Sequence, residues 1–313
     1  MRLRDPETLL TLALYALPVA VALFGFGVPA AFFASLVIIV VGIFVRSRRL
    51  VGRVDPSRLE LHTITYSHYV EKARWCLDRL GVAYEEVPSI GILGVLLTGR
   101  TVPTLAVPAT RTSIGDSTEI LRFLWGRYSG ELPDRTRFLA PSPEAIALET
   151  HFNEDLGVPV RLWSYWHLLE RPDLTLIMWG HEEPSIPQWQ KALLPPLRPV
   201  LAALLRRMLG LNEANAARGI VKTREIFAEV DTMLADGRRY LMGGDELTFV
   251  DITFASLAAL IIFPDGYTGG SASVTQLPVE RLPADWRAEV EMLRATRAGQ
   301  FVMRMYAEER RPR

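Results

Sequence analysis

Residues 8–45 contain no charged side chain, and this uncharged stretch is the feature that most constrains how the chain folds. As one α-helix it would be about 57 Å long at ~1.5 Å per residue, whereas the apolar core of a bilayer is about 30 Å thick. The glycines and the proline in its middle, within residues 25–29, favour a turn. The stretch therefore predicts a transmembrane helical hairpin with spans over 9–24 and 29–45.

Arginines flank the uncharged stretch on both sides. They are Arg2 and Arg4 before it, and Arg46, Arg48, Arg49 and Arg53 after it. Because basic residues beside membrane spans stay in the cytoplasm, a hairpin satisfies both flanks, whereas a single span satisfies only one. A secretory signal has a shorter apolar region of about 7–15 residues. We therefore expect residues 1–53 to anchor the protein in a lipid bilayer, with the remaining chain on the cytoplasmic side.

The length and composition exclude several other classes of protein. A chain of 313 residues fits two modest domains plus the anchor, and we expect these domains at 54–135 and 136–313. With 35 basic and 35 acidic side chains, the overall charge does not indicate a nucleic-acid partner. A single cysteine, Cys76, rules out an intramolecular disulfide and a CxxC redox pair. The histidines lack the spacing of a metal site, so we expect no metal.

Residues 54–135 follow an alternating strand and helix pattern. An apolar, β-branched run over 59–66 predicts a strand, the apolar positions of 70–80 share one helix face, and 84–87 resembles a second strand. Gly81 stands where a helix C-cap is expected. A strand, a helix and a strand in this order predict two parallel strands with a right-handed connection.

Further along, in the run that ends at residue 107, Pro103 indicates either the entry to another strand or a special turn, because proline cannot donate to a sheet ladder. Asp116 and Ser117 begin a helix that we expect to reach about Trp125, since both residue types favour the N-cap.

Residues 136–313 show helical periodicity almost throughout. The expected helices are 144–156, 160–170, 195–209, 216–235, 249–262, 284–295 and 298–309. Thr248 with Asp251 three residues later predicts a capping box, and Leu247 and Ile252 occupy the positions of a hydrophobic staple. This part is therefore expected to be an all-α C-terminal domain.

Four short motifs, taken in order, resemble the cytosolic glutathione transferase superfamily. They are the segment from Tyr66 and Ser67 to Arg74, then Thr101-Val102-Pro103, then Asp116-Ser117, then Leu247 to Ile252. The resemblance covers about residues 58–310. It implies a thioredoxin-like α/β domain followed by an all-α C-terminal domain, and it leaves only the anchor outside.

The resemblance implies that a hydroxyl at the first strand–helix junction stabilises a glutathione thiolate. A free thiol has a pKa near 8.5, so such a site has to lower it. Ser67 matches the serine-type members and Tyr66 matches the tyrosine-type members; we prefer Ser67, although Ser67 can also serve as a helix cap alone. His68, where the family often has proline, is either an acid–base group or, more simply, an exposed loop residue. Cys76 lies on an apolar helix face and is expected to be a core residue.

The same resemblance implies the residues that bind glutathione. Pro103 corresponds to a cis-proline, and the backbone of Val102 before it pairs with the cysteinyl part of glutathione. Asp116 and Ser117 receive the γ-glutamyl end, although both can also act only as helix caps. Arg100 could reach the glycyl carboxylate or lie exposed in a loop.

The implied function is a membrane-anchored, glutathione-transferase-like enzyme that attacks a hydrophobic electrophile, with glutathione as co-substrate. The alternative is a non-catalytic tethering or binding module of the metaxin-like type, and family analogy also allows a homodimer. By the same analogy, the cluster of His151, Asp155, Arg161, Trp163, Tyr165, Trp166 and His167 should face the N-terminal domain, with no catalytic role assigned. The proline-rich stretch 184–199 is interpreted as a lid or a membrane-surface segment.

Overall fold

The computed structural model describes residues 58–310, except residues 65, 91–101, 111, 269–276 and 278, together with Gly27. The expected membrane hairpin at 9–24 and 29–45, and also Arg100, lie outside the described residues. Among the residues that are described, no helix combines the length and the apolar character needed to cross a membrane.

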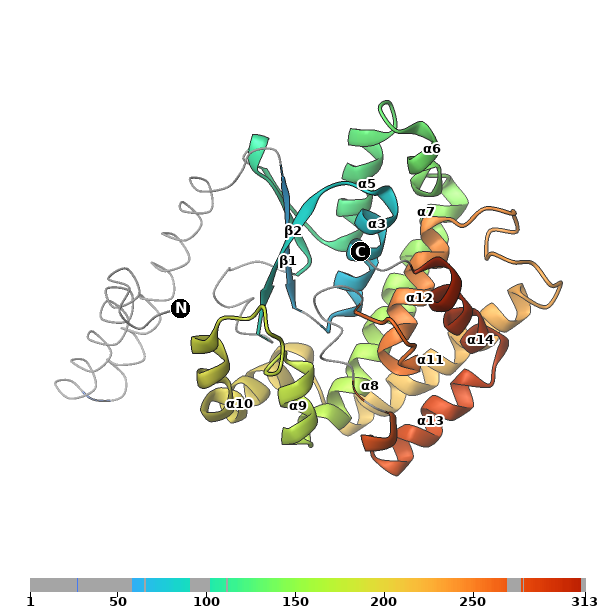
Figure 1. Ribbon diagram of the computed structural model, residues 1–313. Helices are drawn as coiled ribbons and strands as arrows, with labels where there is room; N and C mark the ends of the chain where they lie inside the picture. The colour runs from blue at the N-terminus through green and yellow to red at the C-terminus, as the bar shows by residue number, and fades with distance from the viewer. Residues whose placement is uncertain are drawn as a thin grey trace.

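A four-stranded mixed sheet forms the N-terminal part (Figure 1). Its strands are β1 (Leu59–Ile64), β2 (Tyr84–Ser89), β3 (Thr104–Val107) and β4 (Thr112–Gly115), in the spatial order β2-β1-β3-β4. The β1 and β2 strands are parallel, which confirms the expectation from the strand–helix–strand order. The β3 strand is antiparallel to β1 and β4. The sequence pattern did not predict β4, because its four residues are exposed or half-buried and carry no apolar alternation.

Two helices cover one face of this sheet, and local sequence signals account for their ends. Helix α3 (His68–Leu80) begins after Ser67, whose side chain accepts a hydrogen bond from the Val70 amide. It ends at Gly81, whose φ of 69° lies in the left-handed region that glycine adopts without strain. Helix α5 (Ser117–Tyr128) begins after Asp116. Both helices lie between the sheet and the helical part of the molecule (Figure 1), so the site-forming ends of α3 and α5 meet that part.

Apart from the sheet, α3 and α5, the regular elements among the described residues are helical, as expected. The longer elements are α7 (Pro143–Phe152), α8 (Val158–Leu169), α10 (Gln188–Leu209), α11 (Glu213–Met233), α12 (Phe249–Ile262), α13 (Ala284–Arg294) and α14 (Arg297–Arg304). The shorter ones are α6 (Pro133–Thr136), η1 (Pro108–Thr110), η2 (Arg137–Leu139), η3 (Asn153–Gly157), α9 (Pro172–Met178), η5 (Val279–Arg281) and η6 (Met305–Glu309). The expected helices 144–156 and 160–170 form one continuous run, because η3 joins α7 to α8 by a wider turn.

Helix α12 is the centre of the helical part. All of its residues are buried, as expected for a helix that is apolar on every side. The predicted capping box is confirmed: the backbone N–H and the hydroxyl of Thr248 both lie 2.8 Å from an Asp251 carboxylate oxygen. Asp251 also accepts a hydrogen bond from the Leu241 amide at 2.7 Å. The start of α12 is therefore held from two sides.

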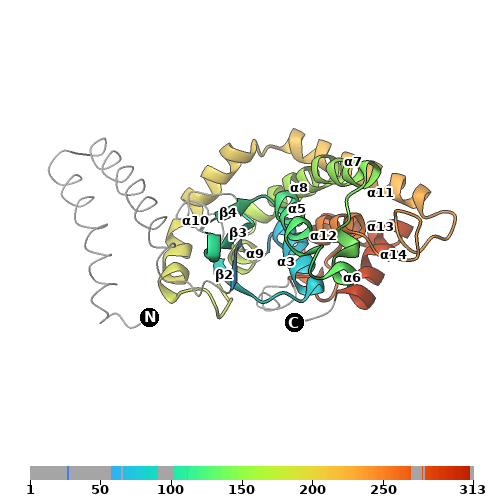
Figure 2. The same ribbon diagram turned by 90° about the horizontal axis from the view of Figure 1, so that it is seen from above.

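Most of the proline-rich stretch 184–199, from Gln188 onward, forms part of a helix. Helix α10 begins at Gln188, earlier than the expected 195, and contains three prolines. It packs with α9 around a second apolar cluster that includes Trp179, Leu194 and Leu201. The Gln190 side chain accepts a hydrogen bond from the backbone N–H of Ile90, just beyond β2. Helix α10 therefore lies at the same end of the molecule as the sheet, with α14 at the other end (Figures 1 and 2).

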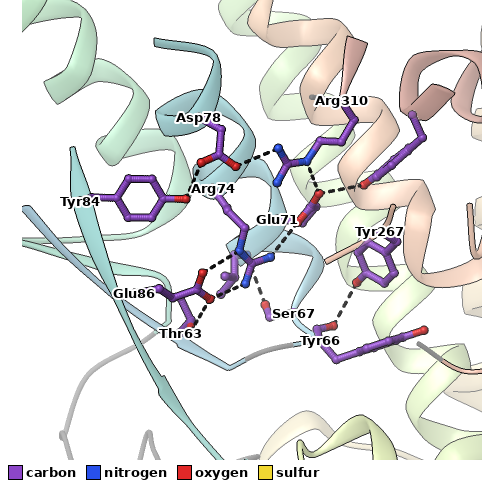
Figure 3. Close-up of polar contacts among 12 residues, drawn as sticks. Thr63, Tyr66, Ser67, Glu71, Arg74, Asp78, Tyr84, Glu86, Tyr267 and Arg310 are labelled. Atoms are coloured by element: carbon purple, nitrogen blue, oxygen red, sulfur yellow. Dashed lines mark hydrogen bonds and ion pairs between the residues drawn. The ribbon is translucent and has the colours of Figure 1, made fainter. Parts of the chain in front are cut away.

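The polar face of α3 is buried as well, in a network of charged side chains (Figure 3). Arg74 bonds both Glu71 and Glu86, and Arg310 near the C-terminus bonds both Glu71 and Asp78. Buried charges are tolerated where they are paired in this way. The network ties the helix, the edge strand β2 and the end of the chain together.

Candidate active site

A cavity of about 780 Å³ opens between the sheet-containing part and the helical part. Its walls come from the junction of β1 and α3, the residues before β3, the first turn of α5, and segments of α7, η3, α8, α9 and α10. The predicted residues Tyr66, Ser67, Val102, Pro103, Asp116 and Ser117 all line it. The tertiary structure thus brings together the described residues that the sequence motifs had singled out.

Ser67 lies at the N-terminus of α3 and is half-buried. Its Oγ accepts a hydrogen bond from the Val70 amide at 3.4 Å. Because Oγ is the acceptor in that bond, the hydroxyl hydrogen is left to donate, and no acceptor for it is found among the described residues. Ser67 can therefore cap the helix and at the same time donate a hydrogen bond to an atom in the cavity.

Tyr66 presents a different environment. Its ring is 4 % exposed and packs edge-on against Tyr267, with 4.9 Å between ring centroids. The hydroxyl of Tyr267 donates a hydrogen bond to the Tyr66 carbonyl oxygen at 3.0 Å (Figure 3). Burial raises the pKa of Tyr66 well above its ordinary value, although the backbone of Leu277 acts in the opposite direction. Tyr66 thus lines the cavity, but its side chain is largely enclosed and its hydroxyl oxygen is buried.

The Val102–Pro103 peptide bond is cis, as the resemblance implied. The Pro103 carbonyl oxygen accepts a hydrogen bond from the Asp116 amide at 3.2 Å, so the loop before β3 is joined directly to the start of α5. Asp116 has a φ of 74°, which is uncommon for a residue other than glycine. Its carboxylate accepts a hydrogen bond from the Thr118 amide at 2.7 Å, which supports this conformation.

Ser117 is 1 % exposed, and its Oγ has no hydrogen-bond partner among the described residues. A buried hydroxyl without a partner is uncommon, because leaving a polar group unsatisfied costs about 1–3 kcal/mol. Since Ser117 lines the cavity at the first turn of α5, a ligand carboxylate could accept its hydroxyl hydrogen and its backbone N–H.

His68 differs from both of its sequence interpretations. It is 2 % exposed, so the prediction of an exposed loop residue is wrong. Its Nε2 lies 3.0 Å from the Gly157 carbonyl oxygen, which can only accept, so Nε2 carries the proton. Burial, together with the charge of Arg161, lowers the pKa of His68 to about 3. His68 is therefore a neutral hydrogen-bond donor that fastens α3 to η3 at physiological pH.

A buried ion pair contacts two residues of the cavity lining. The Lys72 ammonium lies 2.6 Å from Glu149 and also contacts Thr118 and Asn153. Arg122 pairs with the second oxygen of the same carboxylate. Since Thr118 and Asn153 line the cavity, this pair joins α3, α5 and α7 where the two parts of the molecule meet. The sequence showed only charged residues on helices and gave no sign of this arrangement.

The aromatic and charged cluster at 151–167 only partly faces the N-terminal domain. Arg161 and Tyr165 line the cavity, as expected. Trp163 instead packs against Trp286, with 5.6 Å between ring centroids.

His151 also points elsewhere, with one ring nitrogen 2.9 Å from Asp155 and the other 2.9 Å from Glu229. Partial burial lowers the pKa of His151, but hydrogen bonds and charges from Glu229 and Asp155 outweigh this and leave it raised. The prediction was therefore wrong for Trp163 and His151, because successive helical residues point in different directions.

Sequence reasoning missed the wall that α9 and α10 contribute. Trp179, just after α9, and Leu205, Met208 and Leu209 of α10 line the cavity. Their apolar character was visible, but nothing in the local pattern says which helix face meets a cavity. Cys76 is fully buried and outside the cavity lining, which confirms its expected role in the core. Among the described residues, no group of histidine, cysteine and acidic side chains is arranged to hold a metal ion.

Comparison with known proteins agrees with this architecture. Residues 61–132 match the family model of the glutathione S-transferase N-terminal domain. No curated protein matched the sequence.

Among solved structures, a glutathione transferase from Phanerochaete chrysosporium is 16 % identical, with 80 % of this chain and 96 % of that chain covered and a TM-score of 0.51. A glutathione S-transferase from Ceriporiopsis subvermispora in complex with glutathione is 17 % identical, with 80 % and 96 % covered and a TM-score of 0.48. One from Methylobacterium radiotolerans in complex with glutathione sulfonate is 19 % identical, with 80 % and 92 % covered and a TM-score of 0.42.

The match at residues 61–132 and the similarity to the Phanerochaete structure identify the described part of this chain as a glutathione transferase fold.

Proposed function

We propose that this protein is a glutathione transferase that stabilises the glutathione thiolate with Ser67 and directs it at a hydrophobic electrophile. The observation that carries the proposal is the convergence of a free Ser67 hydroxyl hydrogen, the cis Val102–Pro103 bond and the unpartnered Ser117 hydroxyl on one cavity. Each feature has a role in folding, but only a ligand would use all three together.

Two features of α3 favour a thiolate beside Ser67. The Ser67 hydroxyl hydrogen is available to donate to sulfur, and a hydrogen bond to the charged form lowers a pKa. The N-terminus of α3 also carries the positive end of the helix dipole, which favours negative charge at that position. Together they act on a thiol whose free pKa is near 8.5 and populate the nucleophilic form at neutral pH.

Burial supports Ser67 over Tyr66 as the thiol-binding hydroxyl. The Tyr66 hydroxyl oxygen is enclosed, and its ring is held by Tyr267, so a sulfur atom could reach it only after repacking. Ser67 is half-buried and needs no such change.

The remaining site residues are proposed to orient glutathione. The backbone of Val102, beside cis-Pro103, would pair with the cysteinyl unit, while Ser117 would bind the γ-glutamyl carboxylate and Asp116 its ammonium. Arg100, which lies outside the described residues, stays a proposed partner for the glycyl carboxylate. In the reaction, the thiolate electron pair forms a carbon–sulfur bond, and the electrophile releases a leaving group with its electron pair or accepts a proton from water.

A hydrophobic electrophile fits the apolar wall of Trp179, Leu205, Met208 and Leu209. We further propose that residues 8–45 tether the protein to a bilayer, where such electrophiles concentrate, with the soluble part in the cytoplasm. Retention of the full-length chain in carbonate-washed membranes tests the tether. A homodimer remains compatible with parallel tethers, and light scattering of the detergent-solubilised chain would measure it.

The first experiment is calorimetric titration of glutathione into the full-length protein in detergent, together with ultraviolet detection of bound thiolate. The variants are Ser67→Ala, Ser67→Thr and Tyr66→Phe. We expect micromolar to millimolar binding, a thiolate signal that Ser67→Ala loses, and a signal that Ser67→Thr keeps because threonine retains the hydroxyl. Since Ser67→Ala also removes a helix cap worth about 1 kcal/mol, its folding is verified by thermal unfolding.

Two results would contradict the assignment. Loss of the thiolate in Tyr66→Phe but not in Ser67→Ala would transfer the role to the tyrosine. Absence of glutathione binding to the folded wild-type protein would favour the tethering or binding module instead.

A further inference from the structure

Arg161 is the one cationic side chain among the described residues that line the candidate active site, and it has no ion-pair partner among the described residues. Its Nε is buried and makes no hydrogen bond there. The guanidinium carbon lies 5.9 Å from the centre of the Tyr69 ring. The other charged groups in the lining, Asp116 and Glu154, are both exposed, and neither pairs with Arg161.

An unpaired, half-buried guanidinium is costly to maintain. Several buried or half-buried arginines elsewhere in the described chain are paired with carboxylates: Arg74 with Glu71 and Glu86, Arg122 with Glu149, and Arg310 with Glu71. Others, such as Arg198 and Arg294, donate hydrogen bonds to backbone carbonyl oxygens. Desolvation without an opposite charge is unfavourable, so a bare cation in a cavity points to an anionic ligand.

The position of Arg161 in the fold indicates which ligand it is available to. Arg161 lies on α8, and Tyr165 follows it by one helical turn on the same face. The apolar residues Leu205, Met208 and Trp179 line the same cavity from α9 and α10. By contrast, the residues proposed to hold glutathione come from α3, α5 and the loop before β3. Arg161 lies on α8, outside the three segments proposed to hold glutathione, so it is available to the second substrate.

We propose that Arg161 binds a carboxylate on the second substrate, so that the preferred electrophiles are apolar molecules carrying one anionic group. This inference rests on the proposed function and specifies its substrate class. The guanidinium fork matches a planar carboxylate in a bidentate geometry, and the apolar wall accepts the body of the molecule. The Tyr69 ring packs against the Arg161 guanidinium and is itself held in place. Burial raises the pKa of Tyr69 to about 12, and its protonated hydroxyl donates a hydrogen bond to the Asn153 carbonyl oxygen at 3.0 Å.

The chemistry can be followed with a chloronitrobenzoate. The glutathione thiolate forms a bond to the ring carbon that carries chlorine, and the electron pair is held briefly by the ring and nitro group. The carbon–chlorine bond then breaks, and chloride leaves with its electron pair. The Arg161–carboxylate pair takes no part in bond making; it holds the ring in the cavity, so Arg161 is a positioning residue for this step.

Binding of unreactive ligands tests the proposal without requiring turnover. Naphthalene carboxylate and naphthalene carboxamide have the same shape and differ by one charge. Each is titrated by calorimetry into the full-length protein in detergent, for wild type, Arg161→Gln, Arg161→Lys and the control Arg207→Gln. Arg207 is exposed on α10 and does not line the cavity. All variants share the same micelles, so partition of each ligand into detergent cancels between variants. The unequal partition of the charged and the neutral ligand is measured in protein-free micelles and corrected.

We expect the wild type to bind the carboxylate about 10- to 100-fold more tightly than the carboxamide, the range of a charge-assisted hydrogen bond. Arg161→Gln should remove this preference, Arg161→Lys should restore part of it, and Arg207→Gln should leave it unchanged. With the chloronitrobenzoate and the matching chloronitrobenzamide, Arg161→Gln should raise KM for the benzoate alone.

Three outcomes would overturn the proposal. They are a wild type without preference for the carboxylate, an equal loss of both ligands in Arg161→Gln, and weaker glutathione binding in Arg161→Gln with carboxylate binding intact. The last outcome would assign Arg161 to glutathione. Since ligand binding and glutathione binding are measured separately, failure of this inference is distinguishable from failure of the proposed function.

Discussion

Replacing Arg74 with methionine should destabilise the fold more than replacing a charged side chain at the surface. Arg74 is 1 % exposed and donates three hydrogen bonds to two carboxylates (Figure 3). Its Nε and Nη2 lie 3.0 and 2.6 Å from the oxygens of Glu86, and its Nη1 lies 2.7 Å from Glu71. Methionine fills much of the same volume but leaves both carboxylates without this cation.

The expected loss follows from the burial of the partners. The Glu71 side chain is fully buried and that of Glu86 is 5 % exposed. Removing one partner of a buried ion pair costs about 3–5 kcal/mol, because the remaining charge stays desolvated. For a domain of this size, about 2–4 °C of Tm is lost per kcal/mol, so Tm should fall by about 6–20 °C. Glu71 keeps Arg310 as a partner, which favours the lower half of this range.

The assay is thermal and urea unfolding of the full-length protein, followed by circular dichroism. Arg127→Met is the matched control, because Arg127 and Glu131 form an ion pair whose side chains are 49 % and 61 % exposed. A surface pair of this kind contributes about 0–1 kcal/mol. Arg74→Lys should fall between the two, since lysine keeps the charge but cannot form the two-pronged contact with Glu86.

The pH dependence separates charge from packing. Buried carboxylates without a cation favour the protonated form, so the folded Arg74→Met variant should bind more protons than its unfolded state. Its stability should therefore rise as the pH falls from 8 to 5, relative to wild type. Equal losses at both pH values, or a loss no greater than that of Arg127→Met, would refute the reasoning.

Three further predictions follow from single contacts. Asp251→Asn should lower the free energy of unfolding by about 2–3 kcal/mol in urea titrations, because the capping carboxylate accepts hydrogen bonds from backbone donors that the amide cannot all satisfy. Because the pKa of His151 is raised in the folded state, protonated His151 stabilises the fold below about pH 6.5, and this contribution is lost as the pH rises through the raised pKa. The difference in unfolding free energy between wild type and His151→Gln should therefore shrink from pH 6 to pH 8. A difference that grows over this range would contradict the reasoning. Gly157→Ala places a Cβ 2.5 Å from the Tyr69 hydroxyl, so it should lower the free energy of unfolding by about 1–3 kcal/mol and weaken ligand binding. The control Gly126→Ala has nothing within 4 Å of the new Cβ and should leave the free energy of unfolding unchanged or raise it.

Several features of the fold could be predicted from sequence because local chemistry determines them. Gly81 ends α3 since only a residue that tolerates a positive φ fits there, and Thr248 with Asp251 starts α12 because their side chains satisfy its first N–H groups. The position of Ser67 at the start of α3 follows from the same rules. These signals need no knowledge of the rest of the chain.

Burial of charge could not be predicted in this way. Glu71, Lys72 and Arg74 form a strongly charged segment of α3, which by itself indicates a solvated face. In the structure all three are buried, since partners from β2, from α7 and from near the C-terminus neutralise them. A charge can be buried only if its counter-charge arrives with it, and that depends on segments far away in the sequence.

The residues of the candidate site also fall into those that local sequence indicates and those that only distant segments of the fold bring into place. The residues proposed to bind glutathione belong to short motifs at strand and helix ends, where the local pattern already determines the backbone, so the sequence by itself was enough to nominate Ser67, Pro103 and Ser117 as candidates. Only the tertiary structure decided that Tyr66 packs against Tyr267, and that Arg161 lines the same cavity as apolar residues of α10. Helical periodicity identifies an apolar or polar face, but the neighbour that covers this face is chosen by packing between distant segments.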